Sequence, residues 1–168
     1  TGLDIAASTV GGDLSLLSGN ASGITDSGTL TVGGNLDATT NDNAGVIELN
    51  DLAVDGTIGV VTDGLGNATI VNDENVNFAA STVGGDLDAT ATTGNISQSG
   101  SITVALTTTL ETIADDATIT LLDPSNSFTG AITVATSGTE GDVSIDGGSA
   151  TGLDIAASTV GGDLSLLS

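Results

Sequence analysis

The sequence predicts an all-β protein built as a parallel β-helix, also called a β-solenoid. Three observations favour this fold: short segments in which aliphatic and hydroxyl side chains alternate, regularly spaced turn residues, and repetition on two length scales. Strands this short are not stable alone, but they bury their apolar faces when the chain coils and successive coils stack. An antiparallel β-sandwich repeat is the alternative fold.

The alternation is clearest in residues 29–32, 101–104, 117–121 and 142–145, which place aliphatic side chains on one face and mainly hydroxyl groups on the other. Gly-Gly, Asp-Gly and Ser-Gly pairs separate such segments and supply tight turns. Because no long stretch shows an apolar period of 3.6 residues, no helix is expected.

The longer repeat is exact, because residues 1–18 and 151–168 are identical. The chain therefore holds one 150-residue period, residues 1–150, and the start of the next, residues 151–168. Internal repetition of this kind is typical of solenoids and arrays. We expect the chain to be part of a longer tandem array.

A shorter, degenerate repeat lies inside the long one. The motif Val-Gly-Gly-(Asp/Asn)-Leu begins at residues 10, 32, 83 and 160, and looser copies of its valine occur at 54, 104 and 134. These valines are 22, 22, 29, 21, 30 and 26 residues apart, which predicts six coils per period. The two widest intervals predict loops at 63–77 and 113–127. With strands about 4.8 Å apart, six coils give an axial repeat of roughly 29 Å.

Composition excludes most other classes of protein. The 168 residues carry a formal charge of −22, with no Lys, Arg, His or Cys. Nucleic-acid binding is not expected without cations to neutralise phosphates, and no apolar run approaches the length of a membrane-spanning helix. Neither an imidazole base nor a thiolate nucleophile is available, so we expect no enzyme activity and no required cofactor. Disorder is not expected either, because 38% of the residues are hydrophobic.

Several segments of these repeats resemble those of filamentous haemagglutinin-like proteins, a group that includes giant tandem-repeat bacterial surface adhesins. The resemblance is carried by residues 23–36, 75–87, 94–104 and 123–134. It implies a right-handed parallel β-helix, secretion to the bacterial cell surface and a fibrous shaft. It also implies that contacts with a cell surface or with glycans are made elsewhere in the full-length chain. It supplies no catalytic residues.

We therefore expect a structural shaft segment of an extracellular fibre, in which identical repeats join end to end as a filament. The alternative is a cation- or glycan-binding module of a surface adhesin. A rod with so many carboxylates attracts Ca²⁺ or other divalent cations, whose preferred ligands are oxygen atoms.

Ordered metal sites would use local acidic clusters, although none matches a calcium-binding loop motif. Solvated turn residues are the alternative interpretation of the same clusters. The candidate ligands are Asp42, Asp51, Asp73, Glu74, Asp86, Asp88, Asp115 and Asp116. The two aromatic residues, Phe78 and Phe128, are expected in the core.

Overall fold

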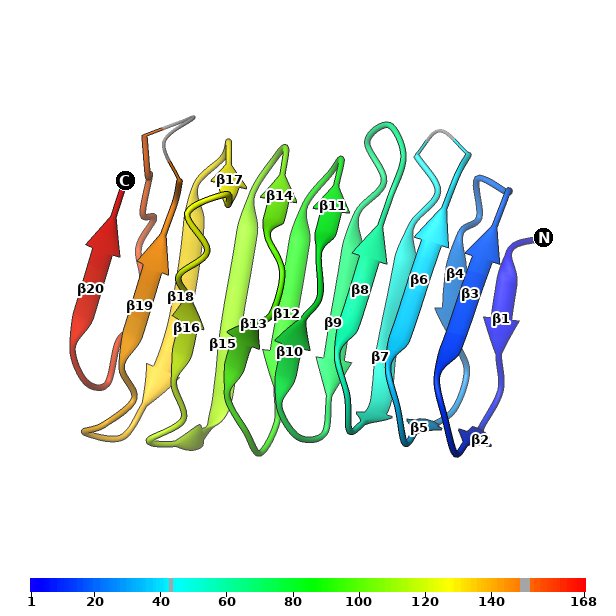
Figure 1. Cartoon of the computed structure of the whole chain (residues 1–168), viewed down its shortest axis with the longest axis horizontal. Coiled ribbons are helices and arrows are strands. Elements are labelled where there is room, and N and C mark those ends of the chain that lie inside the picture. Colours follow the sequence, from blue (N-terminus) through cyan, green and yellow to red (C-terminus); the bar gives the residue numbers. More distant parts are fainter. Residues whose placement is uncertain (43, 149–151) are drawn as a thin grey trace.

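The computed structural model describes residues 1–42, 44–148 and 152–168, and within them it contains strands and turns but no helix. The strands form two sheets that face each other along a β-solenoid (Figure 1). Sheet A contains β1 (Leu3–Ile5), β2 (Ser8–Val10), β4 (Ile24–Asp26), β5 (Leu30–Val32), β7 (Ile47–Val54), β9 (Ala68–Asn72), β12 (Leu87–Ala91), β15 (Thr108–Asp115) and β18 (Ile132–Ser137). Sheet B contains β3 (Leu14–Ser18), β6 (Leu36–Thr40), β8 (Ile58–Val61), β10 (Val76–Phe78), β11 (Ser81–Val83), β13 (Ile96–Gln98), β14 (Ile102–Val104), β16 (Ile119–Leu121), β17 (Ser127–Phe128), β19 (Val143–Asp146) and β20 (Leu164–Leu167).

Every strand pairing among the described residues is parallel, which confirms the predicted β-solenoid. Seven steps of pairing in sheet A lead from Leu3 to Ile155, through residues 24, 47, 68, 87, 108 and 132. Successive coils therefore contain 19 to 24 residues. The expected six coils per period was wrong, because there are seven. At about 4.8 Å per coil, one period rises roughly 33 Å rather than 29 Å.

Each coil has two long sides and, in most coils, a short third strand at one edge of the stack. In the first three coils this strand lies along the lower edge of Figure 1, as β2, β5 and the end of β7; we call it the lower row. In the next three coils it lies along the upper edge, as β11, β14 and β17; we call it the upper row.

The two rows explain the wrong coil count. The valine of the Val-Gly-Gly motif ends a short third strand in either row: Val10 and Val32 do so in the lower row, and Val83 does so in the upper row. The interval between motifs therefore widens where the third strand changes edge. The loops expected at 63–77 and 113–127 were also wrong, because these segments contain β9 and β16.

The core is a stack of aliphatic side chains between the two sheets. Inward positions carry Ile, Leu, Val and Ala, most of them almost fully buried, and strands such as β6 and β12 alternate buried with more exposed residues. Phe78 and Phe128 are 0% and 1% exposed, which confirms that both belong to the core. Burial of aliphatic area against two neighbouring coils is the main source of stability.

The outer face of sheet A carries acids and threonines in strict alternation along one column. Pairing across successive coils aligns Asp4, Thr25, Glu48, Thr69, Asp88 and Thr109. Two acids of this column are therefore separated by two coil spacings, about 9–10 Å. Directly opposed like charges destabilise a sheet, and this order avoids carboxylate neighbours from Asp4 to Thr109 of this column.

Candidate functional site

The strongest candidate site is a nine-residue segment that occurs three times. The sequence Ala-Ala-Ser-Thr-Val-Gly-Gly-Asp-Leu, here called the nonapeptide, occupies residues 6–14, 79–87 and 156–164. Its second half is the Val-Gly-Gly motif described above, and its first half, Ala-Ala-Ser-Thr, is repeated with it. Two copies begin a row of short third strands, the lower row at residues 6–14 and the upper row at residues 79–87.

The middle copy is enclosed by coils on both sides. Its hydrogen bonds to the preceding coil include six that recur below: Ala79 N to Ile58 O (3.0 Å), Val60 N to Ser81 Oγ (3.2 Å), Thr62 N to Thr82 O (2.9 Å), Gly84 N to Thr62 Oγ1 (2.9 Å), Gly85 N to Gly66 O (2.9 Å) and Asp86 N to Asn67 Oδ1 (2.9 Å). Those to the following coil include Ser81 N to Ser101 O (2.9 Å), Ala105 N to Val83 O (3.0 Å), Leu106 N to Gly85 O (3.2 Å), Leu87 N to Thr107 O (3.0 Å) and Thr107 N to Asp86 Oδ1 (3.0 Å).

The copy at residues 156–164 repeats the contacts with the preceding coil. The six equivalent hydrogen bonds are Ala156 N to Ile132 O (2.8 Å), Val134 N to Ser158 Oγ (3.0 Å), Thr136 N to Thr159 O (2.9 Å), Gly161 N to Thr136 Oγ1 (3.1 Å), Gly162 N to Gly141 O (3.2 Å) and Asp163 N to Asp142 Oδ1 (2.7 Å).

The copy at residues 6–14 repeats the contacts with the following coil. The five equivalent hydrogen bonds are Ser8 N to Thr29 O (3.1 Å), Gly33 N to Val10 O (2.9 Å), Gly34 N to Gly12 O (3.1 Å), Leu14 N to Asn35 O (2.8 Å) and Asn35 N to Asp13 Oδ1 (2.8 Å). The copy at 156–164 thus makes the hydrogen bonds to the preceding coil, the copy at 6–14 makes those to the following coil, and the middle copy makes both sets. No atom is used on both sides, so one nonapeptide can bind both neighbours.

The serine of the nonapeptide supplies a hydrogen-bond acceptor where the backbone ladder of the sheet is interrupted. Thr82 pairs with Val61 and Phe78 pairs with Ile58, so the later coil has one extra residue over this stretch. An extra residue disrupts the ladder and leaves a backbone group of the partner strand unpaired. Ser81 Oγ accepts that N–H, from Val60, and donates to Ala79 O at 2.9 Å. The carboxyl-terminal copy has the same extra residue between Ile155 and Thr159.

The two glycines of the nonapeptide allow close contact with the preceding coil. A Cβ at Gly84 would collide with Gly64 O, and one at Gly161 would collide with Gly138 O. Both Gly64 and Gly138 have positive φ, at 59° and 78°, a conformation that glycine adopts without steric cost. At Gly11 a Cβ would meet no described atom within 4 Å.

The comparisons with known proteins agree with a repeat protein. A family model described as repeats of unknown function (DUF5649) matches residues 1–64 and 65–135. The chain belongs to this family. No curated protein and no solved structure matches the chain. The two matched DUF5649 segments correspond to three coils with the lower row and three coils with the upper row. Nothing in these comparisons shows a haemagglutinin-like adhesin.

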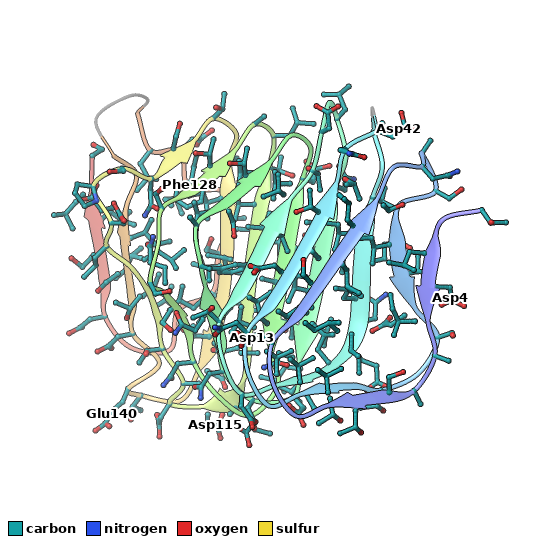
Figure 2. The ribbon with its side chains drawn as sticks, turned by 45° about the vertical axis from the view of Figure 1, so that its right-hand side comes forward. Asp4, Asp13, Asp42, Asp115, Phe128 and Glu140 are labelled. Atoms are coloured by element: carbon teal, nitrogen blue, oxygen red, sulfur yellow. The ribbon has the colours of Figure 1, made fainter. Side chains whose placement is uncertain are left out.

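The predicted metal ligands are spread over the stack. Asp42 precedes β7 and Asp51 lies near its other end, so the structure does not bring them together. Figure 2 shows Asp42 at one edge of the stack and Asp115, with Glu140, at the opposite edge. Asp88 lies on the outer face between Thr69 and Thr109.

One hollow of about 390 Å³ at a corner gathers three of the candidates, Glu74, Asp115 and Asp116, whereas Asp73 does not line it. Two of its carboxylates are already engaged: Asp115 accepts from Ser137 Oγ at 2.7 Å, and Asp116 accepts from Glu140 N at 2.9 Å. Among the described residues, no group of three or more acidic side chains has an arrangement able to hold a metal ion. The candidates are therefore corner and surface residues, and cation binding by them stays a prediction.

Side-chain oxygens at the corners accept hydrogen bonds from the next coil. Because a turn interrupts the backbone ladder at each corner, a backbone N–H of the next coil donates to a side-chain oxygen there. The acceptors are Asp13, Asn67 and Asp86. At Asp86 a second bond comes from Thr107 Oγ1 at 2.6 Å. This hydroxyl, followed by the backbone N–H of Thr107, lowers the pKa of Asp86 below its usual value.

No helix of the described residues has the length and apolar character needed to cross a membrane.

Proposed function

We propose that this DUF5649 chain is a structural segment whose solenoid continues without interruption from one 150-residue period to the next. The single observation that carries the proposal is the middle nonapeptide, which bonds to both neighbouring coils at once. Since residues 6–14 and 156–164 have its sequence and half of its bonds each, a joined period can make the full set. Such a chain forms a rod with backbone ladders along its length.

The pairing register supports this continuity. The column that starts at Leu3 reaches Ile155 and not Leu153, the residue equivalent to Leu3. The offset is two residues. Because side chains in a strand alternate with a period of two, an even offset keeps inward residues inward. Successive periods therefore stack with the same core while shifting slightly around the axis.

The proposed role is the shaft of a secreted fibre at a bacterial surface, without catalytic activity. The resemblance to adhesin repeats supports the location, and the absence of Lys and Arg leaves no trypsin cleavage site in the chain. With a charge of −22, the rod would attract a layer of counter-ions, and divalent cations are the proposed partners.

The test is the length of chains that contain one, two and three periods. Small-angle scattering and electron microscopy should show a straight rod that grows by roughly 33 Å per period, with about 4.8 Å between coils. Growth of roughly 29 Å per period would contradict the seven-coil structure. Compact particles joined by flexible segments would overturn the shaft function.

A further inference from the structure

We propose that the outer face of sheet B is a lateral interface, at which two copies of this chain pair side by side. The partner is the same face of a second copy, and the contact runs along the stack rather than at its ends. The inference goes beyond the proposed function, which concerns the length of a single rod. It rests on the proposed function only where it concerns chains of several periods.

The two outer faces of the stack differ in charge. Outward acids of sheet A are Asp4, Glu48, Asp88, Glu111 and Asp115. On sheet B, the outer face from β10 to β17, here called the neutral face, presents Asn77, Thr82, Ser97, Thr103, Thr120 and Ser127. A chain with 22 acidic residues and no Lys, Arg or His therefore has one uncharged side. Depletion of charge, rather than overall hydrophobicity, distinguishes the centre of a protein interface.

The acids that sheet B does carry lie on either side of the neutral face. Among the described strands of this sheet, only β6 and β19 contain an acid, Asp37 and Asp146. Asp37 leans over the next coil, since a Cβ built at Gly59 would lie 2.6 Å from Asp37 Oδ1. Asp146 Oδ1 accepts a hydrogen bond from Gly148 N at 2.9 Å. Both carboxylates are thus held against the stack and away from the middle of the period.

The hydroxyl groups of the neutral face are available to a partner. Among the described residues, its serines and threonines make no side-chain hydrogen bond. Around sheet A, by contrast, acids accept hydrogen bonds from neighbouring hydroxyls, Asp51 from Thr29 at 2.8 Å and Asp115 from Ser137 at 2.7 Å. Because a hydroxyl group both donates and accepts, a face of free hydroxyls is complementary to a second copy of itself.

Exposed aliphatic side chains lie on the same side of the stack. Val61, which has coils on both sides, is 39% exposed, and its column continues as Thr82 of the neutral face. Leu122, just after β16, is 48% exposed. It lines a hollow of about 360 Å³ that is formed by Gln98, Ser99, Thr120, Leu122, Asp123 and Pro124. Since Thr120 belongs to the neutral face, a paired copy would cover this apolar surface as well.

The size of the face predicts a weak contact for one period and a stable one for several. One period rises roughly 33 Å, and a five-residue strand such as β6 spans about 17 Å. Two such faces bury roughly 1,100 Å² in total, just below the range of about 1,200–2,000 Å² for stable interfaces. Two periods double this area.

A second copy is the partner that can use the face of every period. Ser144 pairs with Ser165, the residue equivalent to Ser15, so the outer face of sheet B continues into the next period. Contacts at successive periods act together only when the partner repeats with the same spacing. Linked contacts of this kind raise affinity by about 10²–10⁴-fold.

Sedimentation equilibrium of the full 168-residue chain tests the pairing. We expect a reversible equilibrium between monomer and dimer, in which salt favours the dimer because it screens repulsion between the remaining acids. A chain of two periods should dimerise at least about a hundredfold more tightly. Chains of one and two periods that stay monomeric at every concentration and salt would overturn the proposal.

Matched charge changes locate the interface. Thr103→Glu places a carboxylate between Thr82 and Ser127 in the neutral face, whereas Thr133→Glu places the same group on sheet A. Thr103→Glu should weaken dimerisation by about tenfold or more, because it opposes like charges across the contact. Thr133→Glu should leave the dimer almost unchanged. Equal effects of the two changes would mean that another face associates, which contradicts the proposal.

A second variant guards against misfolding of the first. Thr120→Glu also lies between uncharged neighbours, Ser97 and Ser144, and should weaken the dimer in the same way. Circular dichroism shows which variants are folded. A folded Thr120→Glu chain that dimerises like the unmodified chain would overturn the proposal.

An uncharged polysaccharide is the other partner that a face of hydroxyls could bind. Co-sedimentation with an insoluble neutral β-glucan separates the two cases. Retention of a chain that does not dimerise, and loss of this retention in Thr103→Glu, would assign the face to glycans and overturn pairing with a second copy.

Small-angle scattering separates failure of pairing from failure of the proposed function. Side-by-side pairing doubles the cross-section of the rod without changing its length, and Thr103→Glu should restore the single width. Single-width rods of the unmodified chain that grow by roughly 33 Å per period reject lateral pairing alone. Compact particles joined by flexible segments reject the continuous rod, while dimerisation of the one-period chain still tests the pairing.

Discussion

The two DUF5649 segments of the chain, residues 1–64 and 65–135, each contribute three coils yet place the short third strand at opposite edges. In both, the row begins with the same nonapeptide and continues through coils of similar length. The difference shows that one nonapeptide sequence can begin a row at either edge. The contacts with a preceding coil are seen for the second and third copies, which follow β8 and β18.

The boundary between the two segments depends on one buried side chain. The lower row ends at Val54, and the next coil has no strand beside it. Asn72, which is 0% exposed, takes that place: Val54 N donates to Asn72 Oδ1 (2.9 Å), and Asn72 Nδ2 donates to Val54 O (3.1 Å). The amide thus replaces the missing peptide group of a strand, while Nδ2 also donates to Asn75 O at 2.7 Å.

Replacement of Asn72 should destabilise the boundary between the two segments, and it has the largest expected effect on the free energy of unfolding. Asn72→Leu leaves the N–H and C=O of Val54 buried without partners, which costs about 2–4 kcal/mol in the free energy of unfolding. Asn77→Thr is the matched control. Asn77 Oδ1 is buried with no hydrogen-bond partner among the described residues, and the column continues as Ser97 and Thr120.

Urea unfolding of both variants measures the difference. The free energy of unfolding of the Asn77→Thr control should stay within about 0.5 kcal/mol of that of the unmodified chain. An Asn72→Leu variant as stable as the control would show that the row can end without a side-chain cap.

Substitution of a nonapeptide glycine should have different effects with and without a coil packed before it in this chain. Gly84→Ala places a Cβ against Gly64 O in the preceding coil, and such overpacking costs about 1–3 kcal/mol. Gly11→Ala meets no described atom and reduces the freedom of the unfolded chain, so we expect a change of about 0 to 1 kcal/mol towards higher stability. Thermal unfolding of the two variants measures the contrast, and equal losses would contradict the close contact between Gly84 and Gly64.

Features that depend on local pattern could be predicted from the sequence, whereas features that depend on neighbouring coils could not. Alternation of aliphatic and hydroxyl residues correctly predicted stacked parallel strands, and Phe78 and Phe128 were correctly placed in the core. The coil count failed because the Val-Gly-Gly motif marks a bend that occurs at either edge. The role of Asn72 could not be predicted, because its partner Val54 is brought beside it only by the coil register.

The alternating acid column crosses both segments and sets a smaller electrostatic prediction. Thr69→Glu would place three acids in consecutive coils, between Glu48 and Asp88. Each new like-charge pair should cost about 0.2–1 kcal/mol at low ionic strength, less in salt because exposed charges are screened.

Thr133→Glu is the control for this column, because its neighbour Thr109 is neutral and the nearest acid of the column is two coils away. Denaturation at low and high salt measures the free energy of unfolding of both variants. Thr69→Glu should lose more stability than Thr133→Glu, and this excess should shrink at high salt. Equal effects would mean that the alternation of acids and threonines has no energetic role.

The smallest expected effect is a pH dependence at the nonapeptide aspartate of the second segment. The pKa of Asp86 is lowered by the hydroxyl and the backbone N–H of Thr107. A lowered folded-state pKa adds stability that is present above the normal aspartate pKa and is lost as the pH falls from about 4 through the folded value. Asp86→Asn keeps an oxygen acceptor, as at Asn67, but removes the titration.

The stability difference between the unmodified chain and Asp86→Asn should therefore shrink below about pH 4. Because protonation of the other acids affects both proteins, this difference isolates Asp86. Thr107→Val removes the hydroxyl donor that contributes most and should weaken the pH dependence while leaving the backbone bond. In the first segment the equivalent following residue is Asn35, which has no hydroxyl, so the stronger Asp86 corner belongs to the second segment only. A difference that does not change with pH would show that the Thr107 contacts hold the neutral and ionised carboxyl equally well.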